Sequence, residues 1–215
     1  MGLMDNGFDL AYDLIQLHRD ARTDPQTGKI SKGVPSKIRC LVPAAFLTAF
    51  AHGEVLVTAA SKRRQLMRAD KTRSVPYHLG SAGMVKAYNG DGTNIAARCR
   101  VAPSGSTRIW RWAVLTGPDL DDYLSDAYTI RNRIAHTGSP NGARVTSTWF
   151  CSAKGTPASI TLMAAEGLLQ AAQDVSFMVA TTAEQRNWRF RLPPRTDTGL
   201  MPSDLESDPR FQARR

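Results

Sequence analysis

The chain has 215 residues, of which 42% are hydrophobic and 22% are charged, so it can bury a core as one domain with an appendage or as two small domains. Its net charge of +9 excludes no class of protein, but it favours a polyanionic partner, either a nucleic acid or an acidic protein. The three cysteines are widely spaced and form no Cys-x-x-Cys pair, which disfavours a disulfide scaffold or a structural zinc site and makes the reducing cytoplasm the expected compartment.

Two helices are predicted in the first third of the chain. Apolar residues at helical spacing predict the first helix over residues 5–20, and a proline and two glycines predict a loop over residues 23–33. The second helix has Pro43 in its first turn and an apolar face that continues to residue 60. Polar residues interrupt this face, so we expect a buried helix and no membrane span, and residues 1–20 lack the pattern of a signal peptide.

A basic run follows the second helix. Lys62, Arg63 and Arg64 stand where cations complement the negative end of the helix dipole. Such a run is most often a solvated helix end, but in a basic chain it is also a candidate RNA contact.

The middle of the chain is rich in residues that break regular structure. Glycines and prolines interrupt residues 70–106, which we interpret as an insertion made of short helices or a small hairpin. The apolar segment over residues 108–115 contains Trp110 and Trp112. We expect a short helix there, with the tryptophans buried in the core and not stacked on bases.

The next helix has clear signals at both ends. Asp119 suits its first turn, and Gly138 and Pro140 close it. Its apolar stripe consists of Leu120, Leu124, Ala127, Ile130 and Ile134.

A last long helix is predicted over residues 158–184, and residues 187–215 are expected to form a loose tail. The sequence therefore predicts an all-α fold. We expect a helical bundle of about four to five main helices in a single domain over residues 1–186, with residues 70–106 as an insertion.

The helix that starts near Asp119 ends in the sequence Arg131-Asn132-Arg133-Ile134-Ala135-His136. With its neighbours, over about residues 120–138, this segment resembles the signature of the HEPN superfamily, which has an Arg followed by a polar residue and a His after a short spacer near the end of a core helix. The resemblance implies a metal-independent endoribonuclease without a cofactor, in which two protomers pair their motif helices around one cleft. It also implies a toxin or phage-defence effector that acts on RNA, with an antitoxin or defence-system protein as a further partner.

These residue types suit RNA cleavage because RNA supplies its own nucleophile, the 2′-hydroxyl. Asn132 and His136 are one helical turn apart and share a face, which the long side chain of Arg131 can reach. His136 can move protons near neutral pH, Arg131 can bind phosphate oxygens, and Asn132 can hold the phosphate or orient the imidazole. We therefore predict Arg131, Asn132 and His136 as catalytic residues, Arg133 as an RNA-binding residue, and no metal site.

Other interpretations of the motif stay open. Arg131 and Asn132 suit a plain surface role, and His136 suits a helix C-terminus, where the dipole stabilises it. A HEPN fold can also be a non-catalytic module that binds RNA or nucleotide or promotes assembly. A basic helical DNA-binding protein is a further alternative, although no helix-turn-helix spacing supports it. Since one Arg, one Asn and one His are few for a reaction that needs both an acid and a base, the catalytic interpretation predicts a homodimer with a shared site.

Overall fold

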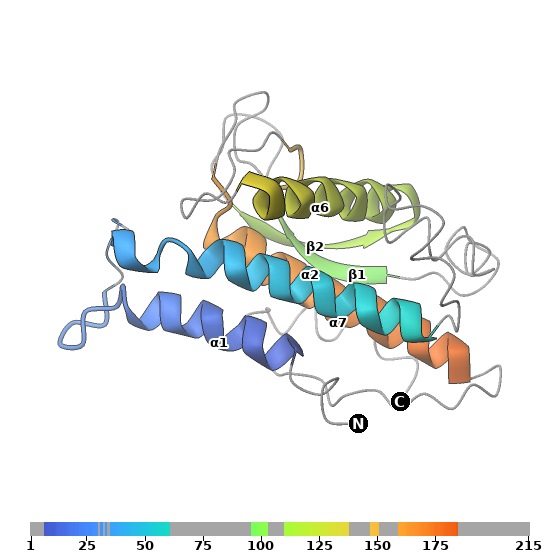
Figure 1. Ribbon diagram of the computed structural model, residues 1–215, viewed down its shortest axis with the longest axis horizontal. Coiled ribbons are helices and arrows are strands. Elements are labelled where there is room, and N and C mark those ends of the chain that lie inside the picture. Colours follow the sequence, from blue (N-terminus) through green and yellow to red (C-terminus); the bar gives the residue numbers. More distant parts are fainter. Residues whose placement is uncertain are drawn as a thin grey trace.

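The computed structural model describes residues 7–29, 31, 33, 35–60, 96–102, 110–137, 147–150 and 159–184. Three helices pack together, and a two-stranded sheet and a fourth helix lie along one side of them (Figure 1). In chain order, the elements are α1 (Gly7–Asp20), a short 3-10 helix η1 (Ser36–Ile38), α2 (Leu41–Ala60), β1 (Ala96–Val101), β2 (Arg111–Thr116), α6 (Gly117–Thr137) and α7 (Leu162–Glu184). Helix α1 runs antiparallel to α2, whereas α2 and α7 run parallel.

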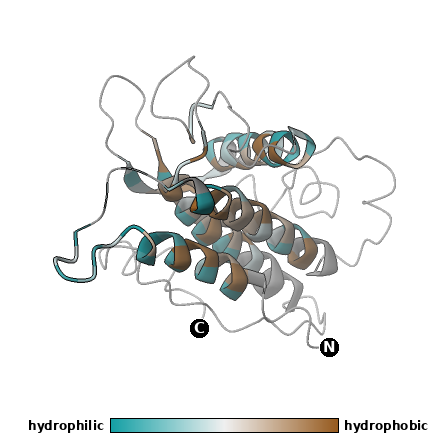
Figure 2. Cartoon of the chain, turned by 60° about the vertical axis from the view of Figure 1, so that its left-hand side comes forward, coloured by the Kyte–Doolittle hydropathy of each residue, from teal (hydrophilic) through white to brown (hydrophobic). Residues whose placement is uncertain are grey.

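The core lies between these helices, whose apolar sides turn toward one another (Figure 2). Helices α2 and α7 approach closely because small residues meet where they cross. A Cβ atom on Gly53 would lie 3.1 Å from the Cβ of Ala172, which leaves little room for a larger side chain. Around this crossing, the largest fully buried side chains include Tyr123, Phe46, Phe150, Ile15 and Leu56.

The prediction of an all-α fold is wrong, because β1 and β2 form a two-stranded antiparallel sheet and the fold is mixed α and β. Pairing runs from Ala96 opposite Thr116 to Val101 opposite Arg111. The predicted short helix over residues 108–115 is therefore mostly strand, and β1 lies inside the predicted insertion. Segments this short have too few apolar positions for periodicity to separate helix from strand, so pairing between strands decides the structure.

Helix α7 covers the edge of β1 that faces away from β2. The backbone N of Arg98 donates a hydrogen bond to Oδ2 of Asp174 at 2.8 Å. Further along, a Cβ atom on Gly167 would lie 2.6 Å from the backbone N of Arg100, so only glycine permits this approach. Because an open strand edge invites pairing with other chains, α7 protects this edge of the sheet.

Two buried carboxylates of α7 hold arginines from other elements. Asp174 accepts hydrogen bonds from Nε and Nη2 of Arg98 at 2.8 and 2.6 Å. Glu166 pairs with Nη2 of Arg19 at 2.6 Å and also with Nη1 of Arg100. The side chain of Glu166 is only 2% exposed, so these arginines balance a charge that water cannot reach. Through them, α7 is tied to α1 and to β1.

The main helices were predicted to within a few residues. Helix α6 begins at Gly117, two residues before Asp119, and α7 begins at Leu162 and not at residue 158. The later start of α7 has a local cause, because Oγ1 of Thr161 accepts a hydrogen bond from the backbone N of Ala164 at 3.2 Å and caps the helix. The predicted tail and most of the predicted insertion lie outside the described residues. None of the described helices combines the length and the apolar character needed to cross a membrane.

Candidate active site

The three predicted catalytic residues lie in the last two turns of α6. The apolar stripe predicted for this helix is confirmed, since all five of its residues are at most 7% exposed. The motif residues lie off the stripe, where Arg131 and Asn132 are partly exposed and Arg133 and His136 are exposed. The catalytic candidates therefore carry little of the core packing.

Arg131 is held by contacts on several sides. Its Nη2 pairs with Oε2 of Glu54 at 2.7 Å, and its Nη1 donates a hydrogen bond to Oδ1 of Asn132 at 2.8 Å. The guanidinium also lies over two aromatic rings, 5.6 Å from the centre of Phe50 and 5.5 Å from the centre of Tyr128, within the range of cation–π attraction. These contacts fix the direction of a long side chain before any ligand arrives.

Glu54 on α2 belongs to this site, although it was not among the predicted site residues. It is the only acidic residue of α2, and the helix contains no Lys or Arg. A single carboxylate in an apolar helix that packs on others needs a cation from elsewhere, because burial of an unpaired charge is costly. The absence of Lys and Arg from α2 was therefore a sign in the sequence that Glu54 needs a cation from another element. It did not show which of the many arginines would be the partner.

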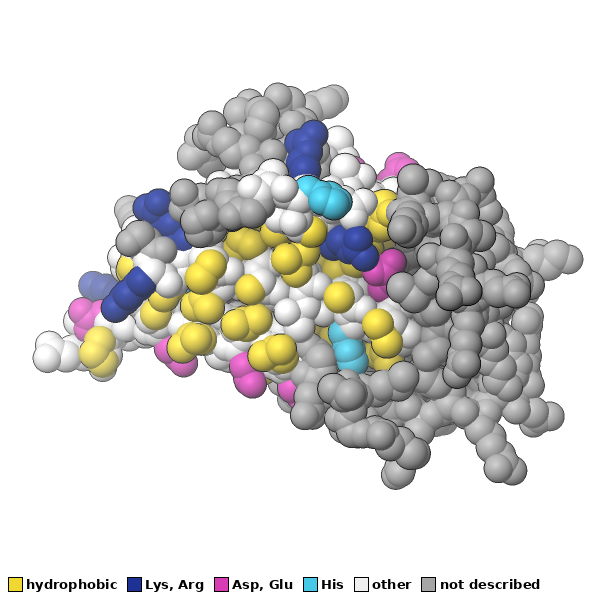
Figure 3. Space-filling view, in the orientation of Figure 1, with side chains coloured by type: hydrophobic (Ala, Val, Ile, Leu, Met, Phe, Trp, Pro, Cys, Tyr) yellow, Lys and Arg dark blue, Asp and Glu magenta, His cyan; other side chains and the backbone are white. Residues whose placement is uncertain are grey.

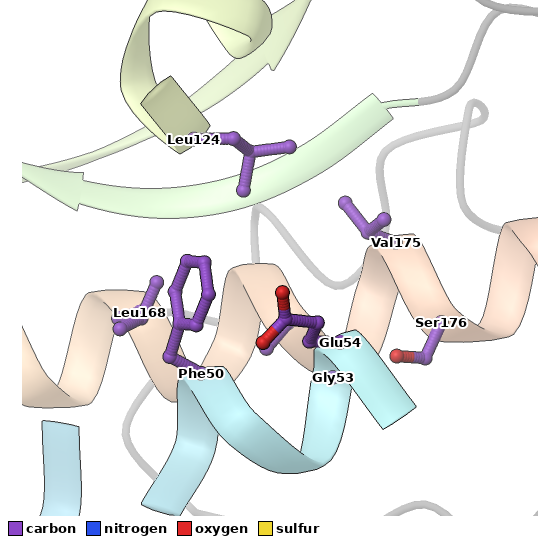
Figure 4. A pocket seen from close by; sticks show the side chains of 8 residues that line it. Phe50, Gly53, Glu54, Leu124, Leu168, Val175 and Ser176 are labelled. Carbon is purple, nitrogen blue, oxygen red and sulfur yellow. The ribbon is translucent and has the colours of Figure 1, made fainter. Parts of the chain in front are cut away.

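A small cavity lies beside Glu54, between α2, α6 and α7 (Figure 4). Its volume is about 20 Å³, close to the space that one water molecule occupies, so it is too small for a substrate. Phe50, Leu124 and Leu168 are among its apolar lining residues. Glu54 thus lies at the edge of the core, and this cavity does not offer a binding site for a substrate.

His136 stands apart from the other catalytic candidates within one chain. Among the described residues, no hydrogen bond joins it to Arg131 or Asn132, and its side chain lies in the exposed last turn of α6. On the face drawn in Figure 3, a histidine and basic side chains gather over α6 above a mainly apolar surface. The structure therefore brings Arg131 and Asn132 together with Glu54, and it leaves His136 free to meet a ligand or another chain.

The remaining predicted site residues are the four RNA-binding candidates, all of them cationic. Arg133 is exposed on α6, whereas Lys62, Arg63 and Arg64 lie outside the described residues. Within the described part of the chain, no group of three or more His, Cys, Asp or Glu side chains is placed to hold a metal ion.

Comparisons with known proteins reveal no relative of the chain. No family model matches it, and neither the curated proteins nor the solved structures contain a significant match.

Proposed function

We propose that this chain is an endoribonuclease that needs no metal ion and cleaves RNA through attack of the 2′-hydroxyl on the adjacent phosphorus. The observation that carries the proposal is the fixed guanidinium of Arg131, which Glu54 and two aromatic rings hold on the same outer helix as an exposed His136. A positioned cation and a titratable imidazole are the two groups that this reaction requires.

Arg131 retains donors for a phosphate. Of the five N–H groups of a guanidinium, the hydrogen bonds to Glu54 and Asn132 use two, which leaves three for the oxygens of a substrate. Glu54 neutralises part of the positive charge of Arg131, but it also restricts the motion of the Arg131 side chain. Less conformational entropy is therefore lost when RNA binds. Arg131 would then stabilise the extra negative charge on phosphorus, and Asn132 would keep one edge of the guanidinium in place.

The proton transfers would involve His136. In the first step a base takes the proton of the 2′-hydroxyl, the new bond from the 2′-oxygen to phosphorus forms, and the bond to the 5′-oxygen breaks. An acid gives a proton to the departing 5′-oxygen, so the products are a 2′,3′-cyclic phosphate and a 5′-hydroxyl. One imidazole cannot serve as the base and the acid at the same moment, so a second histidine is needed.

A homodimer would supply that second group. His136 is five positions after Arg131, so the directions of the two side chains differ by about 140° around the helix axis at 3.6 residues per turn. A two-fold axis beside α6 would place His136 of each chain near Arg131 of the other, and Arg133 from both chains would make the cleft more basic. We therefore propose a shared site between two copies, in a toxin or phage-defence effector whose activity a partner protein restrains.

Cleavage of single-stranded RNA in excess EDTA tests the proposal. The expected products carry 2′,3′-cyclic phosphates, and His136→Ala and Arg131→Ala should each lower the rate by about 10²–10⁴-fold without loss of helical circular dichroism. Arg133→Gln is the matched control, since it removes a neighbouring charge from the same helix and should mainly weaken RNA binding.

The mechanism, the catalytic role and the shared site can each be contradicted separately. A requirement for magnesium with 5′-phosphate products would exclude the mechanism. Full activity of His136→Ala, or RNA binding without cleavage, would favour the non-catalytic module. An active monomer in sedimentation, or a mixture with His136→Ala that keeps the activity of the wild-type fraction, would exclude the shared site.

A further inference from the structure

A second cavity lies at the end of the helical layer where α1 ends and α2 and α7 begin, on the left in Figure 1. Its volume is about 440 Å³, which is within the range of sites for small molecules. His18 lines it from the last turn of α1, Arg22 from the segment after α1, Arg39 from the segment between η1 and α2, and residues 159–163 from the first turn of α7 and the residues before it. The motif residues of α6 are not part of its wall.

His18 is a buried polar group in this wall that lacks a partner. His18 is only 2% exposed, and its Nδ1 atom has no hydrogen-bond partner in the described structure. Burial, and then the charge of Arg22, lower the pKa of His18 below its ordinary value. Because Nδ1 is itself buried, an anion in the cavity acts on His18 mainly through its charge, which favours the imidazolium.

The charge around the cavity is positive. Nε and Nη2 of Arg22 donate to the backbone oxygen of Ser31, which is a neutral group and leaves the guanidinium charge uncompensated there. Arg19, the nearest other cation on α1, is already paired with Glu166. Among the described lining residues, none is acidic. An anion in the cavity would therefore be attracted by the guanidinium of Arg22.

The first turn of α7 adds backbone donors to this charge. Thr161 caps the amide of Ala164, while the amides of Leu162 and Met163 have no acceptor within the helix. At the opposing end of α1, Thr23 caps a carbonyl, because its N and its Oγ1 both donate to the oxygen of Arg19. The positive end of the α7 dipole is thus presented to the cavity, whereas the negative end of α1 is partly satisfied.

We propose that this cavity binds the phosphate group of a small phosphomonoester. Arg22, Arg39 and the first turn of α7 hold the phosphate, and the imidazole of His18 pairs with it. The apolar side of the wall, which includes Val42 and Ile160, contacts the organic part of the ligand. This site goes beyond the proposed RNA cleavage and does not depend on it.

The test is an NMR titration of the histidine ring protons with AMP, inorganic phosphate and adenosine at constant ionic strength. Phosphate and AMP at millimolar concentration should each raise the pKa of His18 by about 1, because a nearby anion favours the imidazolium. AMP should bind more tightly than phosphate, and adenosine should have no effect. His52, which packs edge-on against Phe8 with ring centres 4.5 Å apart, is the internal reference and should not respond.

Substitutions of arginines inside and outside the cavity wall test where AMP binds. Arg22→Gln and Arg39→Gln should each weaken AMP binding by about tenfold, as expected for a charged hydrogen bond to phosphate. Arg111→Gln, an exposed position on β2, should leave binding unchanged. If Arg22→Gln disturbs its loop, the exposed Arg39 still provides the test. An unchanged His18 in saturating phosphate and AMP, an equal response to adenosine, or equal weakening by Arg111→Gln would each overturn the proposal.

Discussion

Removal of the cation from the buried Arg98–Asp174 pair should destabilise the fold strongly. The two side chains are 4% and 0% exposed, and Arg98 donates three hydrogen bonds to the carboxylate, two from its side chain and one from its backbone. In Arg98→Met, Asp174 keeps the backbone bond and the bond from Nε2 of Gln170, which is 3.1 Å long. The carboxyl group then lies in the core and has lost Arg98 as its counter-ion.

The expected cost follows from this geometry. Breaking a buried ion pair typically costs about 3–5 kcal/mol. Burial raises the pKa of Asp174 to about 6 despite Arg98, so without the arginine the carboxyl group takes up a proton near neutral pH. Protonation relieves part of the penalty, and we therefore expect the lower end of the range, about 3 kcal/mol. That is a large part of a typical folding free energy of about 5–15 kcal/mol.

Urea unfolding at pH 7, followed by circular dichroism, measures this loss. Arg111→Met is the matched control, because Arg111 is exposed on the partner strand, and its free energy of unfolding should change by no more than about 0.5 kcal/mol. The double variant Arg98→Met/Asp174→Leu should recover part of the loss, since no charge is then stranded. A loss below about 1 kcal/mol in Arg98→Met would refute the reasoning.

Three further predictions use the same structure. Since the pKa of Asp174 is higher in the folded state than its ordinary value of 3.8, the native state holds a proton that the unfolded state releases. The free energy of unfolding should therefore fall as pH rises from about 4 to about 6 and then level off, and Asp174→Asn should remove this slope in urea titrations. Gly167→Ala should lower the free energy of unfolding by about 1–3 kcal/mol, because the added methyl group meets the backbone of β1; an unchanged urea midpoint would disprove this close contact. Glu54→Gln should lower the rate constant kcat for RNA cleavage less than Glu54→Ala, because Gln can still accept a bond from Arg131; equal kcat values in wild type and Glu54→Ala would exclude a positioning role for Glu54.

The sequence was sufficient to predict a helix where the apolar periodicity extended over several turns and the residues at the helix ends were typical of helix termini. Helix α6 combines a stripe over four turns with an acid in its first turn, and tertiary packing follows the same stripe. The outward direction of the motif could therefore be predicted correctly, because residues off a buried stripe must face another surface or solvent.

The sheet was missed for a physical reason. Strand β1 is buried along nearly its whole length, although it contains Arg98 and Arg100, so its pattern is not the alternation of a half-exposed strand. Arg98 is buried and Arg100 is half-buried because Asp174 and Glu166 reach them from α7, more than sixty residues later. A contact so distant in sequence leaves no local signal. The available local signal was weaker, namely two short segments separated by Pro103, Ser104 and Gly105, of which only the second contains aromatic residues.

The isolated acids of the apolar helices connect these observations. Glu54 in α2, and Glu166 and Asp174 in α7, each lie in helices that contain no Lys or Arg, so each required an arginine from another element. Glu166 and Asp174 hold arginines of α1 and β1 in place. Glu54 holds Arg131, which is partly exposed and lies next to three further motif positions on the outer face of α6. The side chains of Arg19 and Arg100 are exposed to a similar extent, but Arg131 is also held by two aromatic rings and lies on the same helix as His136. The kcat values of the Glu54 variants, and not the exposure of Arg131, therefore separate a role in binding an anion from a purely structural one.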